Sequence, residues 1–152
     1  MFVVDTNILV YAADRQSLDH GPCRELLESV RAQTTPWYLT WGIVYEFLRV
    51  STHPRVLTRP FTSDQAWTFL HALFASPSLG MLSETDRHRH VAAEVFADVP
   101  GLEGNLVFDT HTAILMRENG IRTIYTRDAD FNRFPFLDTV DPVTGNRRTS
   151  KS

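Results

Sequence analysis

The sequence predicts an α/β protein in which helices cover both faces of a central parallel sheet. Short runs rich in β-branched and aromatic residues alternate along the chain with longer segments whose apolar residues recur at helical spacing. Capping and turn residues separate these segments, and the 152 residues contain no internal repeat and no linker of biased composition. Strands that alternate with helices are typical of parallel sheets, because a parallel strand pair needs a long crossover connection.

The first half of the chain predicts two strands and four helices. In order, these are a strand at 2–4, helices at 6–13 and 22–32, a strand at 37–40, a helix from 42 to about 53, and a helix that opens at 62 and stops before 77. Thr6 or Asn7 suits the cap position of the first helix. Thr62 and Gln65 match a capping box for the last one, while Pro54 ends the helix before it.

The second half predicts two more strands and two more helices. They are a strand at 79–82, a helix that is capped within 83–86 and runs to about 98, a helix at 105–118, and a strand at 123–126. Asn119 and Gly120 close the last helix, since glycine favours the left-handed conformation that follows many helix ends. The order of elements therefore continues the α/β pattern.

Residues 1–143 are predicted to form a single domain, followed by a basic, polar tail at 144–152. The tail holds Arg147, Arg148 and Lys151 and no acid, so the rest of the chain carries a net charge of −6 although the whole carries −3. An acidic body disfavours binding of nucleic acid through a broad basic face. A phosphodiester substrate would therefore have to be held locally, by a metal ion or a basic partner.

The start of the chain has neither a basic leader nor a long apolar run. A signal peptide needs a basic region before its apolar core, and a spanning helix needs about 20 apolar residues. We therefore expect a cytoplasmic protein without a membrane segment.

Four carboxylates are placed where a functional site is expected. Asp5 and Asp128 follow the first and last predicted strands, and ligands in open parallel sheets collect beyond such carboxyl ends. Glu46 and Asp109 lie on partly apolar helix faces, where an acid is costly unless it is paired or bound to a metal. Each acid also has an ordinary explanation as a cap, a turn former or an ion-pair partner.

If the four acids converge, their repulsion requires a counter-charge. Lys151 is the only lysine, so the candidates are Arg49, Arg127 and a metal ion. Mg²⁺ or Mn²⁺ suits oxygen ligands. We expect Asp5 and Asp109 to bind it directly, Asp128 to bind it directly or through water, and Glu46 to bind it through water.

Four short segments around these acids also carry a family resemblance. They are Val4-Asp5-Thr6-Asn7-Ile8-Leu9; Glu46-Phe47-Leu48-Arg49 with Thr52-His53-Pro54-Arg55-Val56; Phe108-Asp109-Thr110-His111; and Thr126-Arg127-Asp128-Ala129-Asp130-Phe131 with Arg133-Phe134-Pro135. In this order the segments resemble PIN-domain nucleases, above all the VapC-type toxins of bacterial toxin–antitoxin pairs. Thr110 and His111 depart from the family's usual residues, and the residues after Pro142 have no counterpart.

The resemblance implies a three-layer α/β/α sandwich and catalytic roles for Asp5, Glu46, Asp109 and Asp128. It also implies an endoribonuclease that uses Mg²⁺ or Mn²⁺, acts on an RNA substrate, forms a homodimer and is inhibited by a cognate VapB-type antitoxin. Two alternatives within the family stay open: a housekeeping RNA-processing nuclease and a non-catalytic PIN scaffold. The RNA and the antitoxin are not identified by any motif.

A phosphatase of the haloacid-dehalogenase type is a competing interpretation of the strand-end Asp5. That chemistry needs a second aspartate two residues later, where this chain has Asn7, and the body of the chain has no lysine. The sequence therefore disfavours a phosphatase.

Three further residues lie close in sequence to the acids. Asn7 and Thr126 are expected to orient the acids or a bound water, although a plain capping or turn role is equally compatible. Asp130 competes with Asp128 for the metal, since both follow the same strand. We favour Asp128.

Two other patterns have ordinary interpretations. The run 87–90, Arg-His-Arg-His, is typical of a solvated helix face, and His88 and His90 are too close in sequence to share a face and bind one metal. Trp67, Leu70 and Phe74 form an apolar stripe that is expected in the core, with a dimer or antitoxin surface as the alternative.

Overall fold

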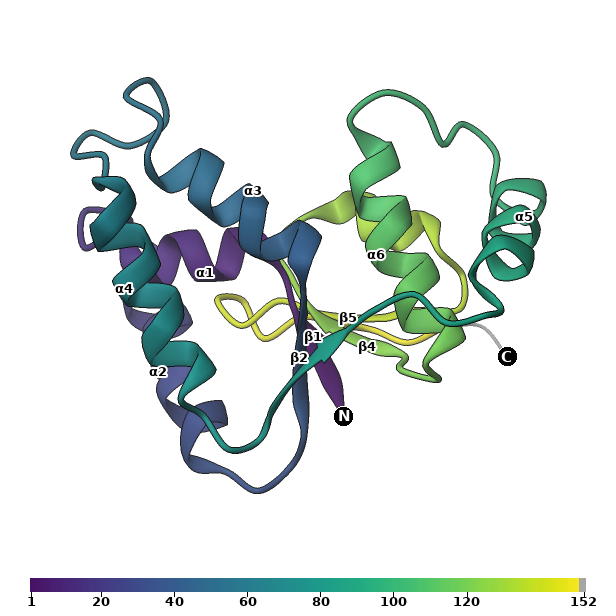
Figure 1. Ribbon diagram of the computed structural model, residues 1–152, viewed down its shortest axis with the longest axis horizontal. Helices are drawn as coiled ribbons and strands as arrows, with labels where there is room; N and C mark the ends of the chain where they lie inside the picture. The colour runs from purple at the N-terminus through teal and green to yellow at the C-terminus, as the bar shows by residue number, and fades with distance from the viewer. Residues whose placement is uncertain (151–152) are drawn as a thin grey trace.

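The strands of the computed structural model form one six-stranded sheet in the order β3-β2-β1-β4-β5-β6 (Figure 1). The structure describes residues 1–150. The strands are β1 (Phe2–Val4), β2 (Trp37–Thr40), β3 (Leu79–Leu82), β4 (Thr123–Tyr125), β5 (Asp138–Val140) and β6 (Arg147–Arg148). β1 to β5 pair in parallel and β6 is antiparallel to β5, so the sheet is mixed but mostly parallel.

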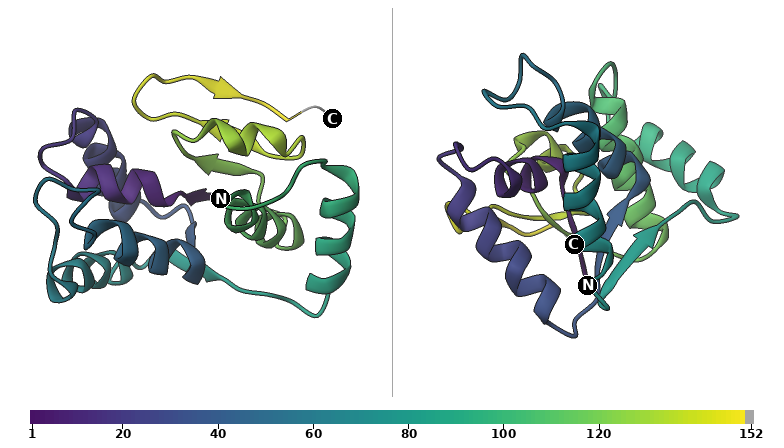
Figure 2. Two further views of the ribbon diagram at one scale, coloured as in Figure 1. Left: turned by 90° about the horizontal axis from the view of Figure 1, so that it is seen from above. Right: turned by 60° about the vertical axis from the view of Figure 1, so that its left-hand side comes forward.

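Two groups of helices enclose this sheet, as the views in Figures 1 and 2 show. The helices are α1 (Thr6–Ala13), α2 (His20–Ala32), α3 (Trp41–Ser51), α4 (Ser63–Phe74), α5 (His88–Asp98), α6 (Leu106–Glu118) and the short 3₁₀ helix η1 (Ala129–Arg133). α1 to α4 lie on one side and α5 and α6 on the other. The predicted three-layer α/β/α sandwich is therefore confirmed.

The central strands are apolar because both of their faces are covered. Val3, Val4, Leu39 and Ile124 have no exposed surface, as expected for strands enclosed by helices on two sides. The indole nitrogen of Trp37, also fully buried, donates to Ser76 Oγ at 3.3 Å. Burial of these side chains fixes the register of the sheet on which the site is built.

Helix starts agree with the sequence where a side chain caps the helix and differ where none does. The capping box of Thr62 and Gln65 is present at the start of α4. The cap of α1 is Asp5, not Thr6 or Asn7, because the Asp5 carboxylate accepts from the Thr6 amide. α2 begins at His20, two residues before the predicted start.

The predicted cap of α5 within residues 83–86 is wrong. The Thr85 hydroxyl accepts from the Arg87 amide, and the Thr85 carbonyl accepts from the His88 amide. These bonds form a turn, so the helix begins only at His88 and has no side-chain cap.

The C-terminal part of the sheet was not predicted, and part of the predicted basic tail belongs to it. Arg147 and Arg148 form β6, which is joined to β5 by a turn in which the Asp141 amide donates to Asn146 O at 2.9 Å. The Ser150 amide donates to Asp138 Oδ1 at 2.6 Å. β5 is Asp-Thr-Val and β6 is Arg-Arg, so neither contains an apolar run like that of β1, which explains the omission. Lys151 lies outside the described residues.

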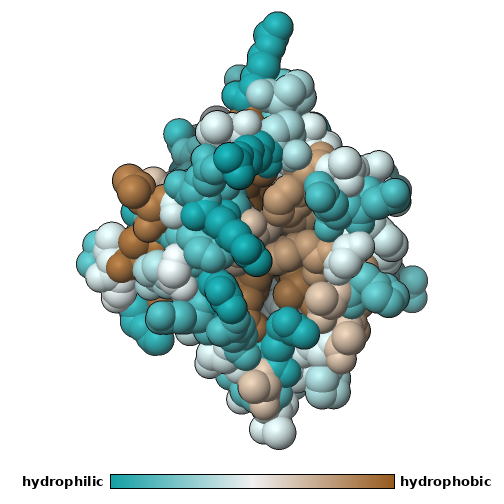
Figure 3. Space-filling model, turned by 90° about the vertical axis from the view of Figure 1, so that its left-hand side faces the viewer, coloured by the Kyte–Doolittle hydropathy of each residue, from teal (hydrophilic) through white to brown (hydrophobic). Residues whose placement is uncertain are grey.

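The apolar stripe on α4 divides between core and surface. Leu70 is fully buried, Phe74 is partly buried and Trp67 is 45% exposed. A cavity of about 290 Å³ lies between α1, α2 and α4, lined by apolar side chains such as Leu27 and Phe69 and by three arginines. Figure 3 looks onto this side and shows hydrophobic side chains in a hollow bordered by hydrophilic ones.

Within the described residues, no helix has the length and apolar composition needed to cross a membrane.

Candidate active site

The site lies between the neighbouring strands β1 and β4, where the order of strands in the sheet reverses. β1 is followed by helices on one face, and β4, its neighbour in the sheet, receives the chain from helices on the other face. Such a switch point leaves a crevice beyond the carboxyl ends of the two strands. Asp5 follows β1, and Thr126 and Asp128 follow β4, so the fold itself brings these residues to the crevice.

Asp5 is buried, and three donors hold its carboxylate. The Thr6 amide donates to Oδ1 at 2.7 Å, while Asn7 Nδ2 and the Thr126 hydroxyl donate to Oδ2 at 2.9 and 2.6 Å. Burial nevertheless raises the pKa of Asp5 to about 6, because desolvation of the charged form outweighs these bonds. The hydrogen bonds thus orient the Asp5 carboxylate, but no cationic side chain within residues 1–150 offsets its negative charge.

Glu46 reaches the same place from the middle of α3. Its Oε2 accepts a hydrogen bond from the Thr6 hydroxyl at 2.9 Å, and Arg49 NH2 lies 3.7 Å from its Oε1. Thr6 therefore links the two acids, since its amide holds Asp5 and its hydroxyl holds Glu46.

Asp109 approaches from the opposite side, in the first turn of α6. Its pKa is raised to about 7, first by burial and then by the charges of Asp5, Asp128, Glu46 and Asp130 in decreasing order. All four of these neighbouring charges are negative. Asp109 is therefore the acid whose ionisation is most opposed by its neighbours, and whose charge a cation would most relieve.

Asp128 and Asp130 stand at the start of η1. Asp128 caps this short helix, because its Oδ1 accepts from the Asp130 amide at 2.8 Å, and its own amide donates to Thr126 Oγ1. One carboxylate oxygen each from Asp109, Asp128 and Asp130 lie within 4.8 Å of one another. Both candidates after β4 thus stand beside Asp109, rather than one excluding the other.

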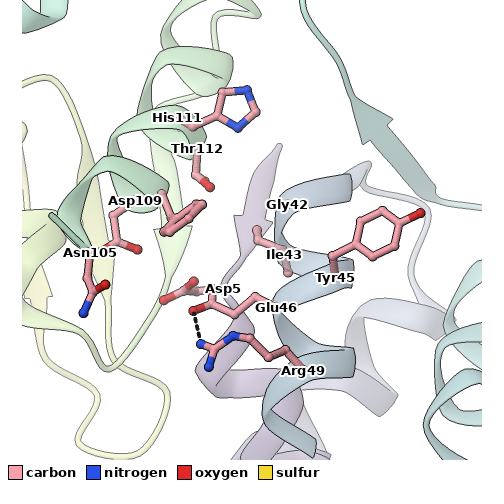
Figure 4. Close-up of a pocket in the computed structure, with 11 residues that line it drawn as sticks. Asp5, Gly42, Ile43, Tyr45, Glu46, Arg49, Asn105, Asp109, His111 and Thr112 are labelled. Atoms are coloured by element: carbon pink, nitrogen blue, oxygen red, sulfur yellow. Dashed lines mark ion pairs between the residues drawn. The ribbon is translucent and has the colours of Figure 1, made fainter. Parts of the chain in front are cut away.

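Two adjoining cavities open onto these acids. The larger, about 580 Å³, is lined by Asp5, Glu46 and Asp109 together with aromatic and polar side chains of α3 and α6. The smaller, about 240 Å³, shares those three acids and adds Asp128. Figure 4 shows Asp5 and Glu46 facing Asp109 across the larger cavity.

Comparison with known proteins shows to which family this chain belongs. The PIN domain matches residues 2–137. The chain belongs to the PIN-domain family. Ribonuclease VapC48 of Mycobacterium tuberculosis is 34% identical over 141 residues, which cover 93% of this chain and 97% of that protein. Ribonuclease VapC43 of the same organism is 34% identical over 145 residues, covering 95% and 97%. Within the PIN domains, this chain is therefore of the VapC type.

Solved structures of the same fold are more distant in sequence. The toxin VapC20 of Mycobacterium tuberculosis, described as cleaving the sarcin-ricin loop, has a TM-score of 0.63 at 18% identity, covering 87% of this chain and 93% of that one. VapBC2 of Rickettsia felis, bound to a DNA fragment from its promoter, has a TM-score of 0.65 at 18% identity, covering 91% and 96%. These likenesses confirm the PIN fold.

Arg49 is the arginine that lines the larger cavity beside the acids of this PIN domain. It lies near Glu46, with two-thirds of its side chain exposed. Arg127, the other candidate counter-charge, instead pairs with Asp19 and with Asp141, whose Oδ2 is 3.4 Å from its Nε. Arg133 Nε also lies 3.3 Å from Asp130 Oδ1. Because, among the described residues, only these two exposed arginines, Arg49 and Arg133, pair with acids of the cluster, the acids outnumber them and the local charge stays negative.

The donor set fits a hard divalent cation. The side chains that converge on Asp109 offer oxygen atoms, and Mg²⁺ and Mn²⁺ prefer oxygen ligands. Burial is the largest cause of the raised pKa values of Asp5 and Asp109, and the charges of neighbouring acids add to it. A bound cation would stabilise the charged carboxylates that both effects disfavour.

Asn7 and Thr126 lie where the sequence placed them, beside Asp5. Asn7 Nδ2 also donates to Thr126 Oγ1 at 3.2 Å, and its Oδ1 accepts from the Arg127 amide at 3.2 Å. Sequence reasoning treated Thr6 only as a helix cap and so missed its bond to Glu46. Its position next to Asp5 was a usable signal, but the pairing with a residue 40 positions away was not.

Proposed function

We propose that this PIN domain is an Mg²⁺- or Mn²⁺-dependent endoribonuclease that acts as the toxin of a toxin–antitoxin pair. The observation that carries the proposal is that Asp5, Glu46 and Asp109 line one cavity, where burial and then the charges of the neighbouring acids raise the pKa of Asp109. Acids gathered in a cleft with perturbed pKa values are typical of catalytic sites. The relatives named as ribonucleases cover nearly the whole chain.

The proposed metal ligands are Asp5, Asp109 and Asp128, and the geometry around Asp109 adds Asp130. A divalent cation bound here would lower the pKa of a water molecule and offset negative charge on the phosphoryl group. Glu46 lies on the same cavity but is held by Thr6, which suits contact with a bound water rather than with the ion.

Other side chains of the cleft suit a single-stranded RNA. Phe108 is 72% exposed and Tyr45 is 66% exposed, and both line the larger cavity. Exposed aromatic rings provide stacking surfaces for unpaired bases. Arg49 is free to contact a backbone phosphate, since its pairing with Glu46 is long at 3.7 Å.

We also propose a homodimer and a protein antitoxin as partners. VapBC2 was solved with both components on promoter DNA, and FitAcB of Neisseria gonorrhoeae has the same fold at a TM-score of 0.61 and 17% identity, covering 93% of this chain and 98% of that one. The acidic cleft favours a basic antitoxin segment, because opposite potentials are complementary.

Cleavage of labelled RNA with and without added metal tests the proposed activity. We expect the wild-type protein to cleave with Mg²⁺ or Mn²⁺ and to stop in EDTA, and Asp5→Asn and Asp109→Asn to lose at least about 100-fold of the rate. Asp64→Asn, which changes an exposed acid on α4, is the matched control and should cleave normally. Normal cleavage by Asp109→Asn would overturn the proposal.

Growth inhibition on expression separates a toxin from a housekeeping nuclease. A toxin should arrest growth, and co-expression of the neighbouring upstream reading frame should relieve the arrest. Normal growth despite active protein would favour RNA processing.

A further inference from the structure

A second cluster of potential metal ligands lies outside the carboxylate site and serves no role in the proposed reaction. Glu84 follows β3, His88 opens α5 and His111 lies on α6. One ligating atom from each of the three lies within 4.8 Å of one from each of the others. The cluster therefore joins three elements that the chain separates by up to 27 residues.

We propose that Glu84, His88 and His111 form a binding site for a divalent transition-metal ion of the Zn²⁺ class. Two imidazole nitrogens and one carboxylate oxygen form a typical three-ligand zinc set with an open fourth position. Mixed nitrogen and oxygen ligands favour this class of ion over Mg²⁺, which selects oxygen. The ligand type thus distinguishes this site from the acids around Asp109.

The distances are compatible with a common ion. His111 Nε2 and Glu84 Oε1 are 2.9 Å apart, and the His88 and His111 rings lie edge to face with centroids 5.6 Å apart. Ligands at zinc distances on one tetrahedral ion are about 3.4 Å from each other. With no separation above 4.8 Å, no pair of ligand atoms has to close by more than about 1.4 Å.

Glu118 orients His88 for this role. The Glu118 side chain is wholly buried, and its Oε1 is 3.1 Å from His88 Nδ1. An ionised carboxylate only accepts hydrogen bonds, so beside ionised Glu118 the His88 Nδ1 donates, and in the neutral ring this tautomer leaves Nε2 with the lone pair that a metal needs. A histidine that donates one ring N–H to a carboxylate while the other nitrogen binds metal is the usual arrangement in metal sites.

The frame around the cluster is held by further contacts. Thr85, next to Glu84, donates from its hydroxyl to Glu118 Oε2 at 3.3 Å. Arg117 lies 3.6 Å from Glu94 and 3.4 Å from Asp98, which ties α6 to α5. The elements that carry the ligands are therefore fixed against one another without an ion.

The site adjoins the cleft but is separate from the acids. His111 lines the larger cavity, and in Figure 4 its ring lies apart from Asp5 and Asp109, toward another end of that cavity. An ion here would join the β3–α5 segment to α6, the helix that carries Asp109. Its expected effect is stabilisation of the folded chain, because ligands that bind only the folded state raise its stability.

Calorimetric titration of the full chain with ZnCl₂, in excess Mg²⁺ to occupy the carboxylate site, tests the proposal. We expect one equivalent of Zn²⁺ to bind and to raise the melting temperature. His111→Gln and Glu84→Gln should each weaken binding by more than about tenfold. Both positions are partly exposed, so these changes are compatible with folding, which circular dichroism checks.

His90→Gln is the matched control. His90 lies on the same helix as His88 and its Nε2 is 3.1 Å from Glu94, but residues 1–150 offer this pair no third ligand, so the variant should bind Zn²⁺ normally. Equal binding by wild type and His111→Gln would overturn the proposal. Loss of binding in Asp109→Asn alone would overturn it too, because the ion would then occupy the carboxylate site.

Discussion

The Thr126 hydroxyl donates a 2.6 Å hydrogen bond to Asp5 Oδ2, across 121 residues of sequence. Thr126 is buried and also accepts from Asn7 and from the Asp128 amide. One hydroxyl therefore connects the acid after β1 with the segment after β4. Removing it should disturb the proposed metal site while leaving all the acids in place.

Thr126→Val tests this connection. The change keeps the shape of the side chain and removes the hydrogen bond to Asp5. We therefore expect the affinity for the metal ion that supports cleavage to fall by about 10–100-fold. The metal concentration that gives half-maximal cleavage measures it. Thr126→Ser retains the hydroxyl and should keep most of the affinity. Wild-type affinity in Thr126→Val would contradict a role for the hydrogen bond.

Asp109→Asn should stabilise the metal-free protein at pH 7.5. The pKa of Asp109 is about 7 in the fold and near 3.8 in a model peptide. Between these values the folded state binds more protons than the unfolded state, so this group lowers the free energy of unfolding as pH rises. The Asp5 carboxyl, with its pKa near 6, acts in the same direction.

Thermal melts in EDTA from pH 5 to 8 measure the effect. The melting temperature of the wild type should fall over this range more than that of Asp109→Asn, and added Mn²⁺ should reverse the fall only in the wild type. Parallel curves for the two proteins would contradict the raised pKa of Asp109 and its causes, burial and the neighbouring acids.

Arg49→Gln should weaken substrate binding more than it slows the chemical step. The side chain is exposed in the cleft, and its loss removes a phosphate contact without removing an acid. We expect KM to rise several-fold with a smaller change in kcat, and the rise to shrink at high salt because the contact is electrostatic. A fall in kcat at constant KM would instead place Arg49 at the reacting phosphate.

Leu70→Ala should reduce the free energy of unfolding by about 2–5 kcal/mol, the range for a leucine removed from a well-packed core. Trp67→Ala, three residues away on α4 but nearly half exposed, should cost less. Urea denaturation compares the two. Equal losses would mean that Trp67 is buried in solution, as in a dimer interface.

The strands and helices that position the site were predictable from local patterns. Val3, Leu39 and Ile124 lie in short apolar runs, and the box of Thr62 with Gln65 fixes a helix start by itself. β5 and β6 were missed because their pairing depends on partners distant in sequence and on a turn around Asp141.

The four acids were predictable as candidates, since strand ends and helix faces are local features. Their partners were not all predictable: the bond of Thr6 to Glu46 and the approach of Asp130 to Asp109 depend on how α3, α6 and η1 pack. The same limit applies to His88 and His111, which no periodicity brings together.

A single titration tests the central claim, that the acids beyond β1 and β4 hold the cation used for RNA cleavage. Mn²⁺ binding is followed by electron paramagnetic resonance, and RNA cleavage is measured in the same samples. We predict that cleavage rises over the Mn²⁺ range in which the ion binds, and that Asp109→Asn loses both together. Full cleavage without bound metal, or Mn²⁺ bound equally by Asp109→Asn, would contradict the claim.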